Sequence, residues 1–239
     1  MKLLISAAVA AVVATGAASA SSIYTVAGSS DLVSNNGSYQ VYEDNGIQMK
    51  LSAGLFTDTA VTGDAVVTPG QYGARPVPYS PGTGITHNNN DGQHTVDSNY
   101  PEVAIMLFDT AVQLTGVWLS YVDPSDTFDL FIDTDNDGIL ERIEQNLALP
   151  DSSVAFVDLL AYNLVGKLFG IGASGYESCK EVYSAQKRKY VTKCETIYSD
   201  WKLKKVVFEE VSDVPLPAAL PLFMAGLAGF GFATRKKRA

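Results

Sequence analysis

Residues 102–133 read "EVAIMLFDTAVQLTGVWLSYVDPSDTFDLFID", and this stretch decides the fold. Three of its segments, 102–109, 112–123 and 126–133, are rich in β-branched and aromatic residues, which is typical of β-strands. In the first segment, apolar residues occupy both alternating sets of positions, so both faces of the strand are apolar. We expect such a strand at the centre of a sheet, covered on each side.

Similar short runs lie nearer the N-terminus, with turn-forming residues between them: "SIYTVAG" (22–28), "SYQVYED" (38–44) and "GIQMKLSAGLF" (46–56). Residues 62–101 are rich in Gly, Pro and Asn and predict a long surface loop containing at most one strand. Residues 139–149 and 152–165 have a partly helical pattern. The chain is therefore predicted to be mostly β, an antiparallel β-sandwich of jelly-roll type with a short helical insertion.

The N-terminus has the pattern of a secretory signal peptide. Lys2 gives a small positive region, an apolar run follows over 3–18, and Ala18-Ser19-Ala20 matches an A-x-A cleavage site. We expect residues 1–20 to be removed on export, with a retained membrane helix as the alternative. Residues 21–213 are long enough for one domain with a substantial core, and this is the predicted β-sandwich.

The C-terminus, 214–239, combines three elements in a fixed order. The motif consists of Val214, Pro215, Leu216, Pro217 and Ala218. An uncharged apolar run over 221–233 and four basic residues at 235–238 follow it. The run predicts an apolar helix at or below the roughly 20 residues needed to cross a bilayer core. A transient membrane anchor that awaits cleavage fits this pattern, and a plain tail anchor is the alternative.

This ending resembles the C-terminal sorting signal of the PEP-CTERM type, in its VPLPA-CTERM variant, found in Gram-negative bacteria. The resemblance implies that an exosortase-type transpeptidase in the inner membrane cuts at the motif. The protein would then pass from an inner-membrane intermediate to the cell surface or extracellular matrix. The sorting enzyme and, transiently, the inner membrane are thus the implied partners.

The body also resembles exosortase-dependent surface proteins, over about 85–211 with gaps. The matching features are "HTVDS" at 94–98, an apolar strand ending in Phe108-Asp109, the pairing over 112–132, and "FGIGAS" (169–174) before a "DWKLKKV" strand (200–206). The insertion at 133–165 and the cysteine hairpin depart from the family pattern. The resemblance implies location and fold more than activity.

The charge of the chain limits its partners. The formal net charge is −9. Without the five basic residues of the two ends, 12 Lys/Arg remain against 26 Asp/Glu, a net charge of −14. So acidic a body repels phosphate backbones, which argues against nucleic acid as a partner and favours divalent cations.

The only two cysteines, Cys179 and Cys194, predict one disulfide, since the chain carries an export signal. The residues between them alternate in the manner of strands around a polar centre at 186–187. Folding a hairpin there places Tyr183 opposite Tyr190 and the two cysteines opposite each other. Together with the strand over 200–213, this hairpin is expected to close the sheet.

The sharpest local motif is "DTDNDGILERIE" at 133–144, which has the spacing of an EF-hand calcium loop. Its predicted ligands are Asp133, Asp135, Asp137, the carbonyl of Ile139, Glu141 and Glu144. The entering helix is missing because a strand precedes the loop, but residues 139–149 can form the exiting helix. We therefore predict a structural calcium site; a turn without an ion is the alternative.

Other polar groups carry weaker signals. Asp123, Asp126 and Asp129 could join the calcium cluster or lie on a solvated turn. His87 and His94 match no catalytic spacing, although Asp91 and Asp97 lie nearby; His94 and Asp97 are expected to hydrogen-bond the loop backbone. No nucleophile elbow, Cys–His pair or zinc helix is present in the sequence, so we predict that the protein is not an enzyme.

These observations predict an exported surface or extracellular-matrix protein with a structural or adhesive role, for example in a biofilm. Extracellular polysaccharide is a further partner to consider. The first alternative is a carbohydrate-binding module in which Tyr72, Tyr79 and Tyr100 line a sugar platform. A glycan hydrolase that uses two carboxylates is the second alternative.

Overall fold

The computed structural model describes residues 21–28, 31–58, 65–87, 95–173, 175–184 and 186–211. The predicted signal peptide (1–20) and sorting signal (214–239) lie outside these residues. Within the described ranges, no helix has the length and apolar character required to span a bilayer.

The fold is mostly β, as predicted. The strands are β1 (Ser21–Thr25), β2 (Leu32–Asn35), β3 (Gln40–Asp44), β4 (Ile47–Asp58), β5 (Ala65–Pro69), β6 (Arg75–Tyr79), β7 (Gly82–Thr86), β8 (Val96–Asp97), β9 (Glu102–Ser120), β10 (Thr127–Ile132), β11 (Glu141–Ala148), β12 (Val154–Asp158), β13 (Leu164–Gly172), β14 (Tyr176–Ser184), β15 (Lys189–Ile197) and β16 (Asp200–Glu210), with two short 3-10 helices, η1 (Gln71–Gly73) and η2 (Leu160–Tyr162).

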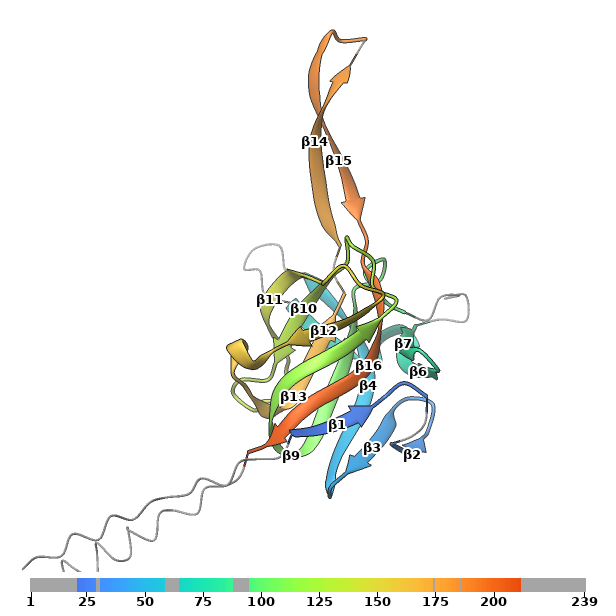
Figure 1. Ribbon diagram of the computed structural model, residues 1–239, viewed down its shortest axis with the longest axis vertical. Coiled ribbons are helices and arrows are strands. Elements are labelled where there is room, and N and C mark those ends of the chain that lie inside the picture. The colour runs from blue at the N-terminus through green and yellow to red at the C-terminus, as the bar shows by residue number, and fades with distance from the viewer. Residues whose placement is uncertain are drawn as a thin grey trace, which may run out of the picture.

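Every described strand pair is antiparallel, as expected. The body is a 14-stranded sheet with the main order β11-β10-β13-β9-β16-β7-β6, to which β1–β5, β8 and β12 are attached. The sheet curls strongly, as an open half-barrel (Figure 1). One curled sheet thus stands where the sequence predicted a two-sheet sandwich.

Strand β9 is the centre of this sheet, and it contains two of the three strands predicted in 102–133. Its first half pairs with β4 and β13, and its second half pairs with β16 and β12. The prediction of two separate strands here is wrong, because residues 108–111 bulge opposite Lys167 without ending the strand. A bulge of this kind bends a strand, and the bend helps the sheet to curl.

The two faces of β9 supply two cores. Ala104, Met106 and Phe108 point into the large core inside the curl. Val103 and Ile105 point the other way, into a smaller cluster with Phe56, Val67, Phe131 and Leu140. Cover on both sides is therefore confirmed for residues 103–106, whereas Leu107, on the same face as Val103 and Ile105, is 43% exposed.

The predicted helical insertion is wrong. Residues 139–149 form β11, which pairs with β10, and residues 152–165 form β12, η2 and the start of β13. Glu, Arg, Gln and Leu give 139–149 a helix-favouring composition, but the edge of β10 offers backbone hydrogen-bond partners along its length, with two irregularities in register. Tertiary context of this kind outweighs helix propensity, which is worth only tenths of a kcal/mol per residue.

The long loop predicted over 62–101 is also wrong, because its described part contains β5 to β8 and η1. Pro76 and Pro78 lie in β6, at the end of the strand order. A proline cannot donate to a ladder, but an edge strand tolerates it because one side has no neighbour. The composition suggested a loop where the structure has short strands, with β6 at the end of the strand order and β7 between β6 and β16.

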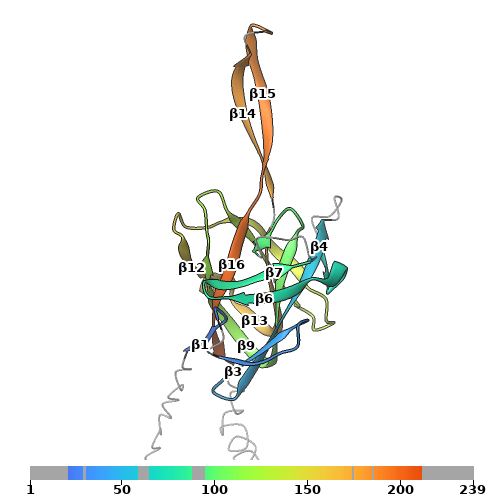
Figure 2. The ribbon, with the colours of Figure 1, turned by 90° about the vertical axis from the view of Figure 1, so that its right-hand side faces the viewer.

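Strands β14 and β15 form a separate two-stranded sheet that projects from the body as an arm (Figures 1 and 2). The prediction that this hairpin closes the main sheet is therefore wrong. Strands β1 and β16 pair side by side, Ser21 opposite Glu209. The start of β1 and the end of β16 lie at the end of the body opposite to the arm (Figure 1).

Candidate functional site

The turn between β10 and β11 brings four carboxylates together. Asp133 follows β10, Asp135 and Asp137 lie in the turn, and Glu141 begins β11. One oxygen of each side chain lies within 4.8 Å of the others, so this group could hold a metal ion. We call these four residues the acidic loop cluster.

Backbone hydrogen bonds organise the cluster. The Asp133 carboxylate accepts hydrogen bonds from the backbone N–H groups of Asp137 (3.1 Å) and Gly138 (3.0 Å). The Asp137 carboxylate accepts one from the N–H of Ile139 (2.8 Å). Gly138 has a φ of 87°, a conformation in which a residue with a Cβ would be strained. The sequence thus builds a tight turn around carboxylates that repel one another unless a cation lies between them.

Glu141 closes the cluster from the strand side. Its carboxylate accepts hydrogen bonds from the N–H (2.8 Å) and the hydroxyl (3.0 Å) of Thr134. Glu141 pairs with Ile132 in the ladder, and its neighbour Leu140 is buried in the smaller core. The acidic loop cluster is therefore linked through Leu140 to the smaller hydrophobic core.

Glu144, predicted to be the bidentate ligand, lies outside the cluster. It pairs with Leu130, further along β11 than Glu141, which pairs with Ile132. The EF-hand spacing assumes an exiting helix that folds position 12 back onto the ion, whereas a strand carries it away. The predicted ligands Asp133, Asp135, Asp137 and Glu141 are brought together; the carbonyl of Ile139 remains a prediction.

Asp126 and Asp129 neither join the cluster nor lie on a solvated turn, because both are buried. Asp129 forms an ion pair with Arg142 (3.1 Å) and accepts a hydrogen bond from the N–H of Asn146 (2.8 Å). Asp126 accepts hydrogen bonds from the N–H groups of Asp123 (2.7 Å) and Asp200 (3.2 Å). Burial raises the pKa of the Asp126 carboxyl to about 6. Both aspartates hold loops and strands together.

His87 belongs to a hydrogen-bonded group that connects β7, the start of β9 and the loop between β8 and β9. Its Nδ1 lies 3.1 Å from the Glu102 carboxylate, whose other oxygen accepts a hydrogen bond from the N–H of Asp97 (3.0 Å). The Asp97 carboxylate accepts one from the N–H of Tyr100 (3.2 Å), which confirms that Asp97 holds this loop. His94 lies outside the described residues.

Of the three tyrosines proposed for a sugar platform, Tyr79 lies at the opposite end of the β6–β7 pair from Tyr72 and Tyr100. Tyr79 ends β6, where the Lys202 ammonium lies 4.4 Å from its ring centre. The Tyr100 ring packs on His87, which follows Thr86 at the opposite end of the β6–β7 pair. Tyr72 is exposed in η1. The described structure does not assemble them into one surface.

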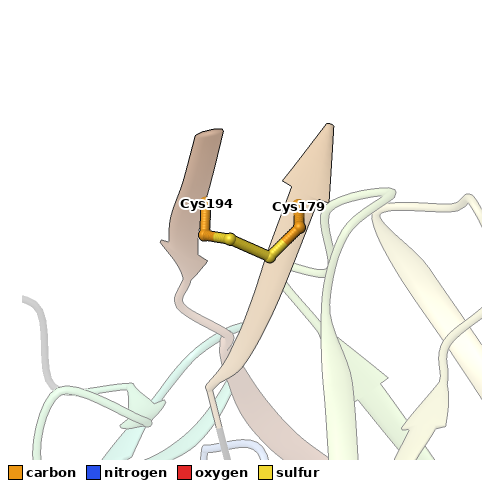
Figure 3. The surroundings of a disulfide bond; sticks show 2 residues. All are labelled: Cys179 and Cys194. Carbon is orange, nitrogen blue, oxygen red and sulfur yellow. A yellow bond between two sulfur atoms is a disulfide. The ribbon is translucent and has the colours of Figure 1, made fainter. Parts of the chain in front are cut away.

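The arm carries the predicted disulfide between Cys179 and Cys194, which lie opposite each other on β14 and β15 (Figure 3). Tyr183 and Tyr190 are also opposite each other, as predicted, with ring centres 5.5 Å apart. Glu177 lies near the two sulfurs, but sulfurs joined in a disulfide do not ligate a metal.

A polar groove of about 620 Å³, which no sequence pattern predicts, lies on the face of β4 that points away from the large core. The groove lies between the β2–β3 turn, β4, the end of β5 and the start of β6. Its lining includes Tyr39, Lys50, Ser52 and Arg75. Four separate segments build this groove, so no local motif signals it.

The chain matches no protein-family model, and neither the curated proteins nor the solved structures contain a significant match to it.

Proposed function

We propose that this protein is an exported surface or extracellular-matrix component with a structural or adhesive role. Its rigid β body would present the disulfide-stapled arm to the surroundings. The observation that carries this proposal is the position of the arm, which projects from the end of the body opposite to the start of β1 and the end of β16 (Figures 1 and 2). A chain held at the cell through its C-terminal end would point the arm outward.

Buried contacts at its base fix the arm to the body. Ser199, directly before β16, donates its N–H to the Ser98 hydroxyl (2.7 Å), and its own hydroxyl accepts a hydrogen bond from the N–H of Thr127 (2.9 Å). Trp201 is fully buried and donates its indole N–H to the Thr127 carbonyl (3.2 Å). An arm with so firm a base can transmit force from a bound partner to the body.

The charge of the arm differs from that of the body. Four of the 12 Lys/Arg residues of 21–213 lie between 184 and 193, a stretch with no Asp or Glu. Outside 176–197, the remainder of 21–213 has seven Lys/Arg and 23 Asp/Glu, a formal net charge of −16. A basic tip on an acidic body favours contact with anionic surroundings at the tip.

The ion of the acidic loop cluster is proposed to be calcium. Calcium prefers hard oxygen ligands and tolerates irregular coordination, and extracellular modules bind it at about 10⁻⁴–10⁻³ M. The ion would stabilise the fold rather than take part in a reaction. Delivery to the surface is proposed to proceed through the sorting motif Val214–Ala218 and an exosortase-type enzyme, on the basis of the resemblance above.

The test replaces residues 177–196 by a short Gly-Ser turn between Tyr176 and Ile197, which pair across the base of the arm. Producing cells that carry either chain are compared for the amount of protein at the surface and for cell aggregation. We expect equal surface amounts and reduced aggregation for the shortened chain. Equal aggregation would reject the adhesive arm, and absence of the complete chain from the surface would reject the proposed location.

A further inference from the structure

We infer that the groove on the outer face of β4 binds an acidic saccharide, that is, a sugar chain whose pyranose rings carry carboxylates. Lys50 and Arg75 would bind the carboxylates, and Tyr39 would pack against a ring. This inference names a ligand class for the proposed adhesive role and rests on that role. Binding of the saccharide can nevertheless be measured on the purified protein alone.

The distribution of cations supports a negatively charged ligand. Between residues 21 and 175 the chain has four Lys/Arg, and two of them, Lys50 and Arg75, line this groove. The other two are engaged: Arg142 pairs with Asp129, and Lys167 donates to the Asp109 carbonyl. No acidic residue is among the described residues that line the groove. Two cations without a carboxylate between them, on so acidic a body, mark a local site for an anion.

The remaining lining favours a sugar over a small inorganic anion. The groove volume of about 620 Å³ is well within the range of small-molecule sites. Asn36, Ser38 and Ser52 supply amide and hydroxyl groups that suit sugar hydroxyls. The Lys50 ammonium lies 4.2 Å from the centre of the Tyr39 ring, so charge and an aromatic face are adjacent. Each unit of an acidic saccharide carries a carboxylate, which can bind the ammonium, on a ring whose face can pack against the tyrosine.

The groove also continues along the sheet, as a polymer requires. A second hollow of about 300 Å³ lies over β3, β4 and β9 and shares Tyr39 and Lys50 with the first. Unlike the first, it is lined by one acidic residue, Asp109, whose carboxylate accepts a hydrogen bond from the N–H of Gln48 (3.1 Å). Lys50 pairs with Val41 on one side and with Leu107 on the other, so it lies in the middle of this face. A chain of several sugar units could therefore lie across the strands. Nucleic acid fits less well, because its dense phosphates meet the repulsion of the body.

The test is calorimetric titration of the purified protein with tetragalacturonate at physiological ionic strength. Fully methyl-esterified tetragalacturonate is the matched neutral probe. The groove variant is Lys50→Gln with Arg75→Gln, and the charge-matched control is Lys204→Gln with Lys205→Gln on β16, outside both the groove and the arm. Melting curves of all three proteins check that they are folded.

We expect the acidic probe to bind, the ester to bind at least about tenfold more weakly, and the groove variant to lose about tenfold in affinity. The β16 variant should bind as the unchanged protein does. Absence of binding, equal binding of the ester, or an equal or greater loss in the β16 variant would each overturn the inference. Because this assay needs no cells, its failure is separable from a failure of the proposed surface location.

Discussion

The guanidinium of Arg142 lies 3.1 Å from the carboxylate of Asp129, and both side chains are buried. Asp129 belongs to β10 and Arg142 to β11, the two strands that flank the acidic loop cluster. The Arg142 guanidinium also lies 5.9 Å from the ring centre of Phe56, in the smaller core. This ion pair therefore links the two strands that flank the candidate metal site to the smaller hydrophobic core.

Replacing one partner of this pair should be strongly destabilising. Arg142→Met leaves the Asp129 carboxylate buried without its cation, which we expect to lower the free energy of unfolding by about 3–5 kcal/mol. Denaturation in urea measures the loss. Lys180→Met, which breaks the exposed pair with Glu195, is the control and should have little effect. Equal effects of the two variants would contradict the structural role of the buried pair.

Calcium should stabilise the protein through Glu141 and not through Glu144. For a dissociation constant of about 1 mM, 10 mM calcium raises the free energy of unfolding by about 1.4 kcal/mol. We expect Glu141→Gln to abolish most of this gain, because it removes a ligand charge while keeping an acceptor for Thr134. Glu144→Gln should retain the gain. Melting curves of EDTA-treated protein, with and without calcium, check both variants. If Glu144→Gln lost more of the calcium stabilisation than Glu141→Gln, Glu144 would be a ligand, as the EF-hand spacing predicts.

Breaking the disulfide should act on the arm alone. In the chain-entropy model a loop of this length gains about 3 kcal/mol from closure, but β14 and β15 form a sheet of their own. Isolated two-stranded sheets are only marginally stable. Cys179→Ser with Cys194→Ser should therefore remove hydrogen-exchange protection from the arm and leave that of β9 unchanged. Loss of protection in β9 would show that the arm folds together with the body.

The buried carboxyl of Asp126 should make stability fall as the pH rises from about 4 to about 6. Burial raises its folded-state pKa from 3.8 to about 6, so the folded chain binds the proton more tightly than the unfolded chain. The contribution of the protonated carboxyl is complete below the unfolded pKa and is lost as the pH rises through the folded pKa. Carbon NMR of the Asp126 carboxyl should give a midpoint near 6. A titration midpoint at pH 4 or below would show that burial does not raise the pKa of the Asp126 carboxyl.

Local patterns predicted several parts of the structure correctly. The alternation in 102–108 indicated a strand between two apolar layers, and the spacing of the cysteines and tyrosines indicated the register of the arm. The DxDxDG run indicated the turn that gathers three of the four carboxylates. In each case the information lies within about 20 residues of chain.

The remaining features depend on contacts between distant segments. Residues 139–149 became a strand because β10 offered an edge, and this change moved Glu144 away from the acidic loop cluster. Asp126 and Asp129 became buried because β11 and the start of β16 cover them. The groove needs four segments that no local pattern relates. Such features follow from the curl of the sheet, which the sequence pattern does not specify.

The intact mass of the protein recovered from the surface of producing cells tests the central proposal most directly. The account predicts a chain that begins near Ser21, ends within or near the motif Val214–Ala218, and has the mass of the form with Cys179 and Cys194 oxidised. Extra mass would identify a covalently attached glycan or lipid and agrees with surface attachment. A chain that still carries Arg235 to Arg238 and remains in the inner membrane would contradict the account.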